Sequence, residues 1–407
     1  MVGEDVITGV LESGGGECEI TSGFGIPSWK KAAGSDIDGR EDFKACVGRF
    51  DEKAEGTDVF NFTYGPSAGG LNESCKFNIY TYGERILSLR PEPAYKDRRL
   101  EVSGSGLVMA ILRLERYCGP LSPFYSGMFA AAVEAIMGNG ENNDLRLARV
   151  IMNEVGRISD HLYVIAKLAE GASQNVAYNL LFGLREKLLR LVSRRFGHRY
   201  FFGINGFGGL ARSADFGGIS SEVGAIAEEF RQLWIRLENS GIFIDRIQGT
   251  ATLRRPWMVG PAARAAGLRT DTRIDGSCLR YDDLDLEVAS AASADTLARS
   301  LVRKDEIFAS ARIIEKAESM IREVPAAVRM NLGEISGEIS VRTETPGGDS
   351  LMRVSLANGV VKKIYIRPSS LQNLAVFTYA IKENLLTDFT FGYEGLGIHV
   401  SELGGVL

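Results

Sequence analysis

The sequence predicts an α+β fold in which a central bundle of long helices is flanked by small N- and C-terminal β subdomains. Three observations support this prediction. Apolar residues recur at i, i+3 and i+4 spacing through the middle of the chain, which is typical of amphipathic helices. Shorter stretches before and after it alternate apolar with polar residues, as half-buried strands do. No internal repeat or low-complexity tract divides the 407 residues, so one α+β unit is expected.

The first β subdomain is predicted from residues 60–90. Residues 76–82 alternate in strand-like fashion, Gly83-Glu84 supplies a turn, and residues 86–89 resume an apolar run, which together indicate a hairpin. The glycine-rich and charged residues 1–60 are interpreted as a leader to which no role can be assigned, and residues 61–407 as the main domain.

The central helices follow from the change to a helical period after Leu107. They are expected over residues 107–114, 127–137, 145–169, 176–196, 220–238 and 295–322. Several long helices in succession favour a bundle.

The C-terminal part returns to a strand pattern. Strands are expected over 338–343, 350–356 and 362–366, with Asn358-Gly359 as the hairpin turn between the last two. A helix over 370–386 and an irregular tail are expected to follow.

Composition and charge exclude several classes of protein. With 45% hydrophobic and 24% charged residues, the chain is an ordinary globular protein rather than a disordered or fibrous one. Its formal charge of -5 predicts no surface that binds nucleic acid through counterion release. No apolar stretch reaches the roughly 20 residues that a membrane-spanning helix needs, and the first residues do not resemble a secretion signal. We therefore expect a cytoplasmic protein that can lie on a membrane but does not cross it.

The cysteines and histidines restrict the possible metal chemistry. No two of the five cysteines form a Cys-x-x-Cys pair, which excludes a self-contained zinc ribbon or a ferredoxin-type cluster motif. A histidine-based triad or three-histidine metal site would need nearly all of the three histidines. They are His161, His198 and His399.

Cys118 is a candidate reactive thiol. It lies in the turn before the helix that begins near Ser122, where the helix dipole and the nearby Arg116 would favour the thiolate. The alternative is a buried cysteine that only packs, and composition alone favours this alternative.

Two further segments carry groups of polar residues. In residues 149–162, Glu154 can pair with Arg157 and Arg157 with His161 on one helix face, which favours a solvated or interhelical structural role over catalysis. Near the C-terminus, His399 precedes Glu402 by three residues in a glycine-rich segment that we expect to be non-helical. This spacing suits metal ligands but is weak evidence for a metal by itself.

Taken in order, several segments resemble the large subunit of the nickel-iron hydrogenases, particularly the energy-converting, membrane-associated group, and the related 49 kDa-type subunit of respiratory complex I. The resemblance covers about residues 60–403. It is carried by PEPAYKDRRLE, ERYCGPLSPFYSGMFAAAVE, RVIMNEVGRISDHL, LFGLREK, GEISVRTETPGGDS, IRPSSLQNLAV and TDFTFGYEGLGIHVSEL. It implies the fold of a nickel-iron hydrogenase large subunit.

The resemblance also implies where the metal ligands of this family would stand. In the hydrogenases, two Cys-x-x-Cys pairs supply four thiolates to nickel and iron. The first pair falls on Cys118 and Leu121 and the second on His399 and Glu402, so three of the four thiolates are absent. The histidine expected after the first pair is Tyr125.

Other motif positions depart from the hydrogenase pattern in the same way. The family's Pro-Arg-Gly-Glu loop reads Pro346-Gly347-Gly348-Asp349, so its arginine is missing, while an acid of the active-site neighbourhood matches Glu101. The resemblance therefore implies a site without a standard nickel-iron centre and without a cofactor bound by this chain. Its candidate catalytic residues line the former metal site, with Glu101 and Glu402 as the proton-handling groups. These candidates are Glu101, Cys118, Tyr125, His399 and Glu402.

The complex I relatives have also lost the thiolates, and they bind a quinone in the vacated space. Their quinone-site histidines are absent from the matching residues 65–77, and Gly119 stands where they have a tyrosine. Arg116 and Arg199 match family arginines near the iron-sulfur cluster of the partner subunit, where a cation stabilises the reduced cluster. Phe202 stands where a histidine is expected.

The leading hypothesis is a peripheral large subunit of a membrane-bound, complex I-like or hydrogenase-related oxidoreductase. It would couple electron transfer from an iron-sulfur small subunit to ion translocation on the cytoplasmic face of the membrane. Its partners would be that small subunit, other peripheral-arm subunits and antiporter-like membrane-arm subunits, without nucleic acid. The alternatives are a non-catalytic scaffold between the small subunit and the membrane arm, or a site that binds a different metal or a quinone.

Overall fold

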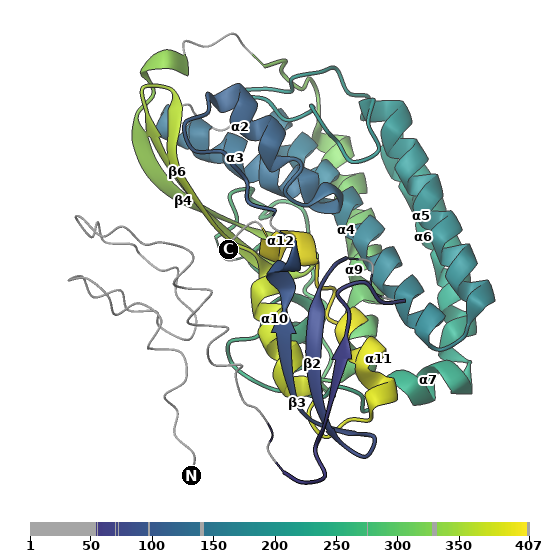
Figure 1. Cartoon of the computed structure of the whole chain (residues 1–407). Coiled ribbons are helices and arrows are strands. Elements are labelled where there is room, and N and C mark those ends of the chain that lie inside the picture. Colours follow the sequence, from purple (N-terminus) through teal and green to yellow (C-terminus); the bar gives the residue numbers. More distant parts are fainter. Residues whose placement is uncertain are drawn as a thin grey trace.

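The computed structural model describes residues 54, 56–69, 71, 73–96, 98–138, 142–274, 276–327 and 332–404. Nearly all of the predicted leader, residues 1–60, lies outside these ranges. The described residues form an α+β fold with central long helices and two small antiparallel sheets, which confirms the predicted fold class (Figure 1).

The helical bundle consists of α4 (Asn143–Gly171), α5 (Asn175–Phe196), α6 (Ile219–Glu238) and α9 (Thr296–Met320). Helix α4 packs between α9 and α5, and α6 packs against both α9 and α5. The side chain of Asn142 caps α4 by accepting a hydrogen bond from the Leu145 N–H. Because α4 is surrounded by other elements, nearly all of its side chains are buried, charged ones included.

The N-terminal sheet contains β1 (Phe60–Tyr64), β2 (Lys76–Tyr82) and β3 (Arg85–Glu92) in antiparallel order. Strands β2 and β3 form the predicted hairpin, and β1 is a further strand that was not predicted. Helices α10 (Ser369–Ala380) and α11 (Phe389–Glu394) lie beside this sheet (Figure 1). Phe77 contacts Phe377, Phe389 and Tyr393 in edge-to-face geometry, with ring centroids 5.1–6.1 Å apart. These aromatic contacts join the N-terminal sheet and the C-terminal helices in one core.

The C-terminal sheet contains β4 (Gly337–Thr345), β5 (Gly348–Ala357) and β6 (Val360–Arg367), again antiparallel. Helices α2 (Leu107–Leu114) and α3 (Ser122–Ile136) pack on it. The tight turn between β4 and β5 touches the first residue of α8 (Gly260–Ala265), while α7 (Gly241–Ile247) follows α6.

The predicted end of the chain was wrong in two respects. Helix α10 ends at Ala380 instead of residue 386, and the tail expected to be irregular contains α11 and α12 (Val400–Gly404). Helices of five or six residues are too short to show a periodic apolar pattern, and they depend on tertiary packing for stability. As a result, His399 directly precedes a helix and Glu402 lies on it.

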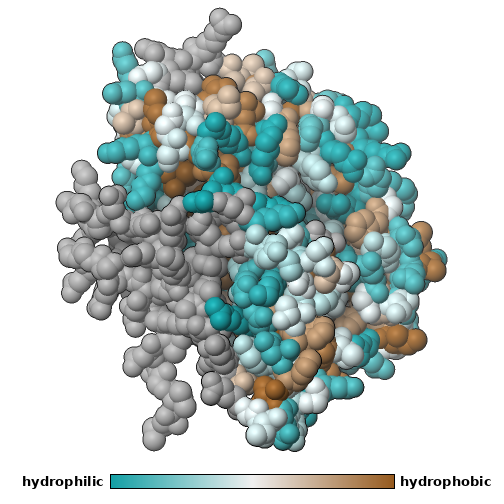
Figure 2. Space-filling view, viewed as in Figure 1, coloured by the Kyte–Doolittle hydropathy of each residue, from teal (hydrophilic) through white to brown (hydrophobic). Residues whose placement is uncertain are grey.

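The described part of the chain has no helix that is both long and apolar enough to cross a membrane. Some large apolar side chains are nevertheless exposed on the bundle, including Val176 and Leu180 on α5 and Ile235 on α6. Figure 2 shows apolar patches interrupted by hydrophilic surface on the face it presents.

The turn between β4 and β5 leads to a prediction about stability. Gly348 has φ +130°, and a Cβ atom there would lie 2.6 Å from the Gly260 nitrogen. We expect Gly348→Ala to destabilise the protein by about 2–5 kcal/mol, because it combines backbone strain with overpacking. Chemical denaturation would measure this. The control is Gly224→Ala, in an open position on α6, which should be neutral or stabilising by up to about 1 kcal/mol. Equal effects of the two substitutions would contradict this account.

Candidate functional site

Four of the candidate residues come together although they lie far apart in the sequence. Cys118 lies in the turn before α3, Tyr125 on α3, His399 directly before α12 and Glu402 on α12. All four are buried, and a fifth buried residue, Asp160 of α4, joins them. The two ends of the predicted site therefore meet in one place.

His399 is the centre of a chain of three groups. Its Nε2 atom lies 2.7 Å from Oδ1 of Asp160, and its imidazole is also hydrogen-bonded to the Cys118 thiol. Burial alone lowers the pKa of His399, but Cys118 and Asp160 outweigh it and raise the pKa well above its usual value. Burial likewise raises the pKa of Asp160, and His399 reverses the effect so that the net pKa is lowered. Near neutral pH the pair is an imidazolium and a carboxylate.

The Cys118 thiol ionises less readily than an exposed cysteine. Burial raises its pKa, and the opposing effect of His399 is not large enough to restore the usual value. Arg116, the arginine expected to favour the thiolate, does not perform this role, because it is exposed and forms an ion pair with Glu115 at 3.6 Å. The cation next to the thiol is His399.

Glu402 is surrounded by hydroxyl donors. The Tyr125 hydroxyl donates to one carboxylate oxygen and the Ser370 hydroxyl to the other. Tyr117 donates to the backbone oxygen of Glu402, which fixes the position of α12. Burial raises the pKa of Glu402 against the influence of His399. Glu402 is thus a buried carboxyl group that can gain a proton more readily than an exposed glutamate.

Glu101 is the candidate that the structure does not bring into this group. Its side chain is exposed, and its backbone oxygen accepts a hydrogen bond from Arg113 of α2. The acid that contacts the site is Asp160. The sequence pattern around Asp160 predicts only a structural helix face, and no local feature indicates its pairing with His399, 239 positions away.

The two candidate arginines lie on the surface in a basic and aromatic cluster. The Arg116 guanidinium lies 4.9 Å from the centre of the Phe202 ring, and His198 stacks on the same ring with centroids 4.4 Å apart. Arg199 pairs with Glu186 at 2.6 Å. Partial burial, followed by the neighbouring arginines, lowers the pKa of His198, so this imidazole is neutral at physiological pH.

The donor set does not suit a nickel-iron centre. Such a centre needs several soft sulfur ligands, and the four positions that the resemblance assigns to its ligands hold one thiol, one leucine, one imidazole and one carboxylate. His399 already bonds Asp160 and Cys118, while both oxygens of Glu402 accept hydroxyl donors. In the described residues, no group of three or more histidine, cysteine or acidic side chains is arranged to hold a metal ion.

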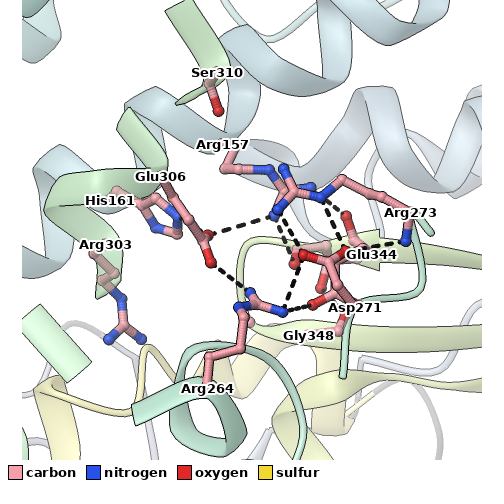
Figure 3. A network of polar contacts seen from close by, with 12 residues as sticks. Arg157, His161, Arg264, Asp271, Arg273, Arg303, Glu306, Ser310, Glu344 and Gly348 are labelled. Atoms are coloured by element: carbon pink, nitrogen blue, oxygen red, sulfur yellow. Dashed lines mark hydrogen bonds and ion pairs between the residues drawn. The ribbon is translucent and has the colours of Figure 1, made fainter. Parts of the chain in front are cut away.

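Figure 3 shows a second buried polar group, which includes His161, the residue that follows Asp160 on α4. The predicted pair of Glu154 and Arg157 on α4 is formed at 3.1 Å, but the face is wholly buried between elements and not solvated. His161 does not pair with Arg157 as expected; its Nε2 lies 2.7 Å from Glu306 of α9. Acids on neighbouring elements compete for both side chains, which a single-helix pattern cannot reveal.

Arg264 of α8 connects this network to the C-terminal sheet. It forms ion pairs with Glu306 at 2.6 Å and with Glu344 of β4 at 2.8 Å. Arg157 adds hydrogen bonds to the backbone oxygens of Glu344 and Thr345. Burial of Glu306 is offset first by Arg264, which helps to hold the pKa of this acid well below its usual range. The network therefore joins α4, α8, α9 and β4.

Known proteins with similar sequences include quinone oxidoreductase subunits and a hydrogenase. The family model described as "Respiratory-chain NADH dehydrogenase, 49 Kd subunit" matches residues 171–333, which is less than half of the chain. The chain is 26% identical over 304 residues to an NADH-quinone oxidoreductase subunit of Protochlamydia amoebophila (strain UWE25), covering 71% of this chain and 74% of that protein. It is 24% identical over 305 residues to the carbon monoxide-induced hydrogenase of Rhodospirillum rubrum, covering 72% and 84%.

The fold itself has a structural counterpart. A chain in the structure of the membrane-bound sulfane sulfur reductase (MBS), an archaeal respiratory membrane complex, superposes with a TM-score of 0.78 at 21% identity. The match covers 86% of this chain and 100% of that chain. It shows that the two chains share a fold.

The pair of His399 and Asp160 generates a prediction about pH. The raised pKa of His399 gives stability that is complete below about 6.5 and is lost as pH rises through the folded-state pKa. The lowered pKa of Asp160 gives stability that is present above about 3.8 and is lost as pH falls through the folded-state pKa. Asp160→Asn should therefore lower the free energy of unfolding most between about pH 3.8 and about pH 6.5, by about 3–5 kcal/mol, and less at alkaline pH.

Denaturant unfolding at a series of pH values would measure this effect. The matched control is Asp285→Asn, which removes a carboxylate that is 84% exposed beside Lys316 and should leave stability unchanged at every pH. A loss of stability in Asp160→Asn that does not vary with pH would show that the pair is not ionised.

Proposed function

We propose that this chain is a peripheral subunit of a membrane-bound respiratory oxidoreductase complex, because residues 171–333 match the family model of a respiratory-chain NADH dehydrogenase subunit. The relatives of known function support this, since they are a subunit of an NADH-quinone oxidoreductase and a hydrogenase. The observation that carries the proposal is the buried group of Cys118, His399 and Glu402, which the sequence resemblance assigns to metal-ligand positions of the hydrogenases.

The proposed site works without a standard nickel-iron centre. The positions of the four thiolates hold Cys118, Leu121, His399 and Glu402. Oxygen and nitrogen donors bonded to other side chains replace soft sulfur, which removes the ligand chemistry that nickel and iron need. No step of the proposed function therefore passes through such a centre.

The chemistry that the site can perform is proton exchange. Glu402 is a buried carboxyl with a raised pKa, and His399 holds a proton between a carboxylate and a thiol. Groups of this kind change protonation state when a nearby charge changes. We propose that an electron arriving in the partner subunit is balanced by protonation here, and that this event is transmitted to ion translocation in the membrane arm.

Electrons would approach the buried group of Cys118, His399 and Glu402 from the surface side chains of Arg116, His198, Arg199 and Phe202. In the proposed complex these surface side chains face the small subunit, and the iron-sulfur cluster of that subunit would be the electron donor. A fixed guanidinium charge stabilises the reduced form of a nearby iron-sulfur cluster. The chain would lie on the cytoplasmic face of the membrane, with the antiporter-like membrane-arm subunits as further partners.

Substitutions in the buried group test the proton role against a scaffold role. We expect Glu402→Gln to lower turnover of the assembled complex by roughly 100-fold or more, since general acid-base groups contribute about 10²–10⁴-fold. Glu101→Gln, which changes an exposed glutamate outside the group, is the matched control and should leave turnover unchanged. Assembled complexes that turn over normally with both Glu402→Gln and Cys118→Ser would establish the scaffold role.

Arg116 provides a separate test of the electron path. Arg116→Met should lower the midpoint potential of the partner's iron-sulfur cluster by roughly tens of millivolts, because loss of a surface charge changes the energy of the reduced state by about 1 kcal/mol. Redox titration of the complex followed by electron paramagnetic resonance would measure it. Arg231→Met is the control, since Arg231 also lies over a phenylalanine ring, Phe308, at 4.3 Å. A potential unchanged by either substitution would place the iron-sulfur cluster elsewhere.

A further inference from the structure

Helix α4 carries a row of four ionisable side chains, and the proposed function uses only the first of them, Asp160. Asp160, Tyr163, Lys167 and Glu170 are spaced by three, four and three residues, so they lie along one face of the helix. At 1.5 Å per residue the row spans about 15 Å. Its inner end, Asp160, is the partner of His399, whereas the Glu170 side chain at its outer end is 40% exposed.

Helix α11 lies against the outer part of this row. Phe391 and Thr390 pack so closely on α4 that a Cβ atom on Gly171 would lie 3.2 Å from the Phe391 ring. Glu394 lies three residues after Phe391 on the same helix and is 5% exposed. Its Oε1 atom has no hydrogen-bond partner in the described structure. Lys167, itself buried, forms an ion pair with Glu170.

The charged and titratable groups that act on Glu394 come from every element around it. Lys167 and Glu170 belong to α4, and His399 precedes α12. Glu394 also acts on three tyrosine hydroxyls, those of Tyr64, Tyr163 and Tyr393. Tyr163 follows Asp160 and precedes Lys167 along the α4 row, and it interacts electrostatically both with Glu394 and with the pair of His399 and Asp160.

We propose that Glu394 and the row on α4 form the route by which protons pass between the surface and the pair of His399 and Asp160. This inference rests on the proposed function, because it supplies the protons that the site exchanges. In one inward transfer, a proton moves from water at the Glu170 end to Glu394, then to the Tyr163 hydroxyl, and finally to the pair of His399 and Asp160. It replaces the proton that this pair has released to the site. No electron moves along the route.

The protonation behaviour of the groups agrees with this role. Burial, partly offset by Lys167, raises the pKa of Glu394 to about 7, so the carboxyl is present in both forms at neutral pH. A carboxyl group and a phenol hydroxyl can each donate and accept a proton. The charge of Lys167 stabilises the ionised form of Glu394, so that the proton is not retained there.

Infrared spectroscopy of the complex gives the first test. The protonated-carboxyl C=O band of Glu394 should disappear on titration through pH 7 in the unmodified complex and should be missing from Glu394→Gln. A band that titrates near pH 7 and is retained in Glu394→Gln overturns the assignment. This measurement needs no turnover, so it stands apart from the proposed function.

Turnover gives the second test. We expect Glu394→Gln and Tyr163→Phe each to lower turnover at least tenfold, to raise the solvent deuterium isotope effect and to remove the dependence on pH near 7. Glu394→Asp should restore part of the rate, which a structural role would not require. The control is Tyr178→Phe, because Tyr178 contacts the same Phe182 ring as Tyr163 does but belongs to α5.

The outcomes separate the two proposals. If Glu402→Gln abolishes turnover while Glu394→Gln and Tyr163→Phe keep the pH profile and isotope effect of the unmodified complex, the route is wrong and the proposed function stands. If Glu402→Gln and Cys118→Ser both turn over normally, the proton role in the proposed function is wrong, and the infrared band alone decides whether Glu394 exchanges protons at neutral pH.

Discussion

The structure depends on the buried ion pairs around Arg264. A guanidinium that is fully removed from water is tolerated only where carboxylates and carbonyls surround it, because its uncompensated burial costs several kcal/mol. Arg264 finds Asp271, Glu306 and Glu344, which come from a loop, α9 and β4. These acids in turn require Arg157 and Arg273. The relative position of the bundle and the C-terminal sheet is thus determined by the need to neutralise charge and not by apolar packing alone.

This constraint also positions the candidate site. His161 and Asp160 are consecutive residues of α4, and they point to different partners: His161 to Glu306 in the network, and Asp160 to His399. Any shift of α4 that improved one contact would disturb the other. The network therefore holds Asp160 against the start of α12, and the pKa values of His399 and Glu402 follow from that placement because both groups are buried beside it.

The sequence predicts what depends on local periodicity and does not predict what depends on contacts between distant elements. The long helices and both hairpins lie at nearly their predicted positions, since their apolar pattern extends over many residues. Helices α11 and α12 are too short for such a pattern, so the sequence predicts an irregular tail in their place. The pair of Glu154 and Arg157 is local and therefore predictable, whereas His161 meets Glu306 across 145 positions. The acid that the resemblance indicates is Glu101, whereas the acid that contacts His399 in the structure is Asp160.

The proposed loss of the thiolates has a consequence for how such a site can work. Four thiolates bring negative charge that a metal pair neutralises, so removing the metals alone would leave that charge buried and unpaired. In this chain the positions that the resemblance assigns to the thiolates carry a thiol with a raised pKa, a leucine, an imidazolium and a carboxyl with a raised pKa. The net charge of these side chains changes when they gain or lose protons and does not depend on a bound metal. A site of this composition can remain folded without a metal and still respond to a charge that arrives nearby, which is the property the proposed coupling requires.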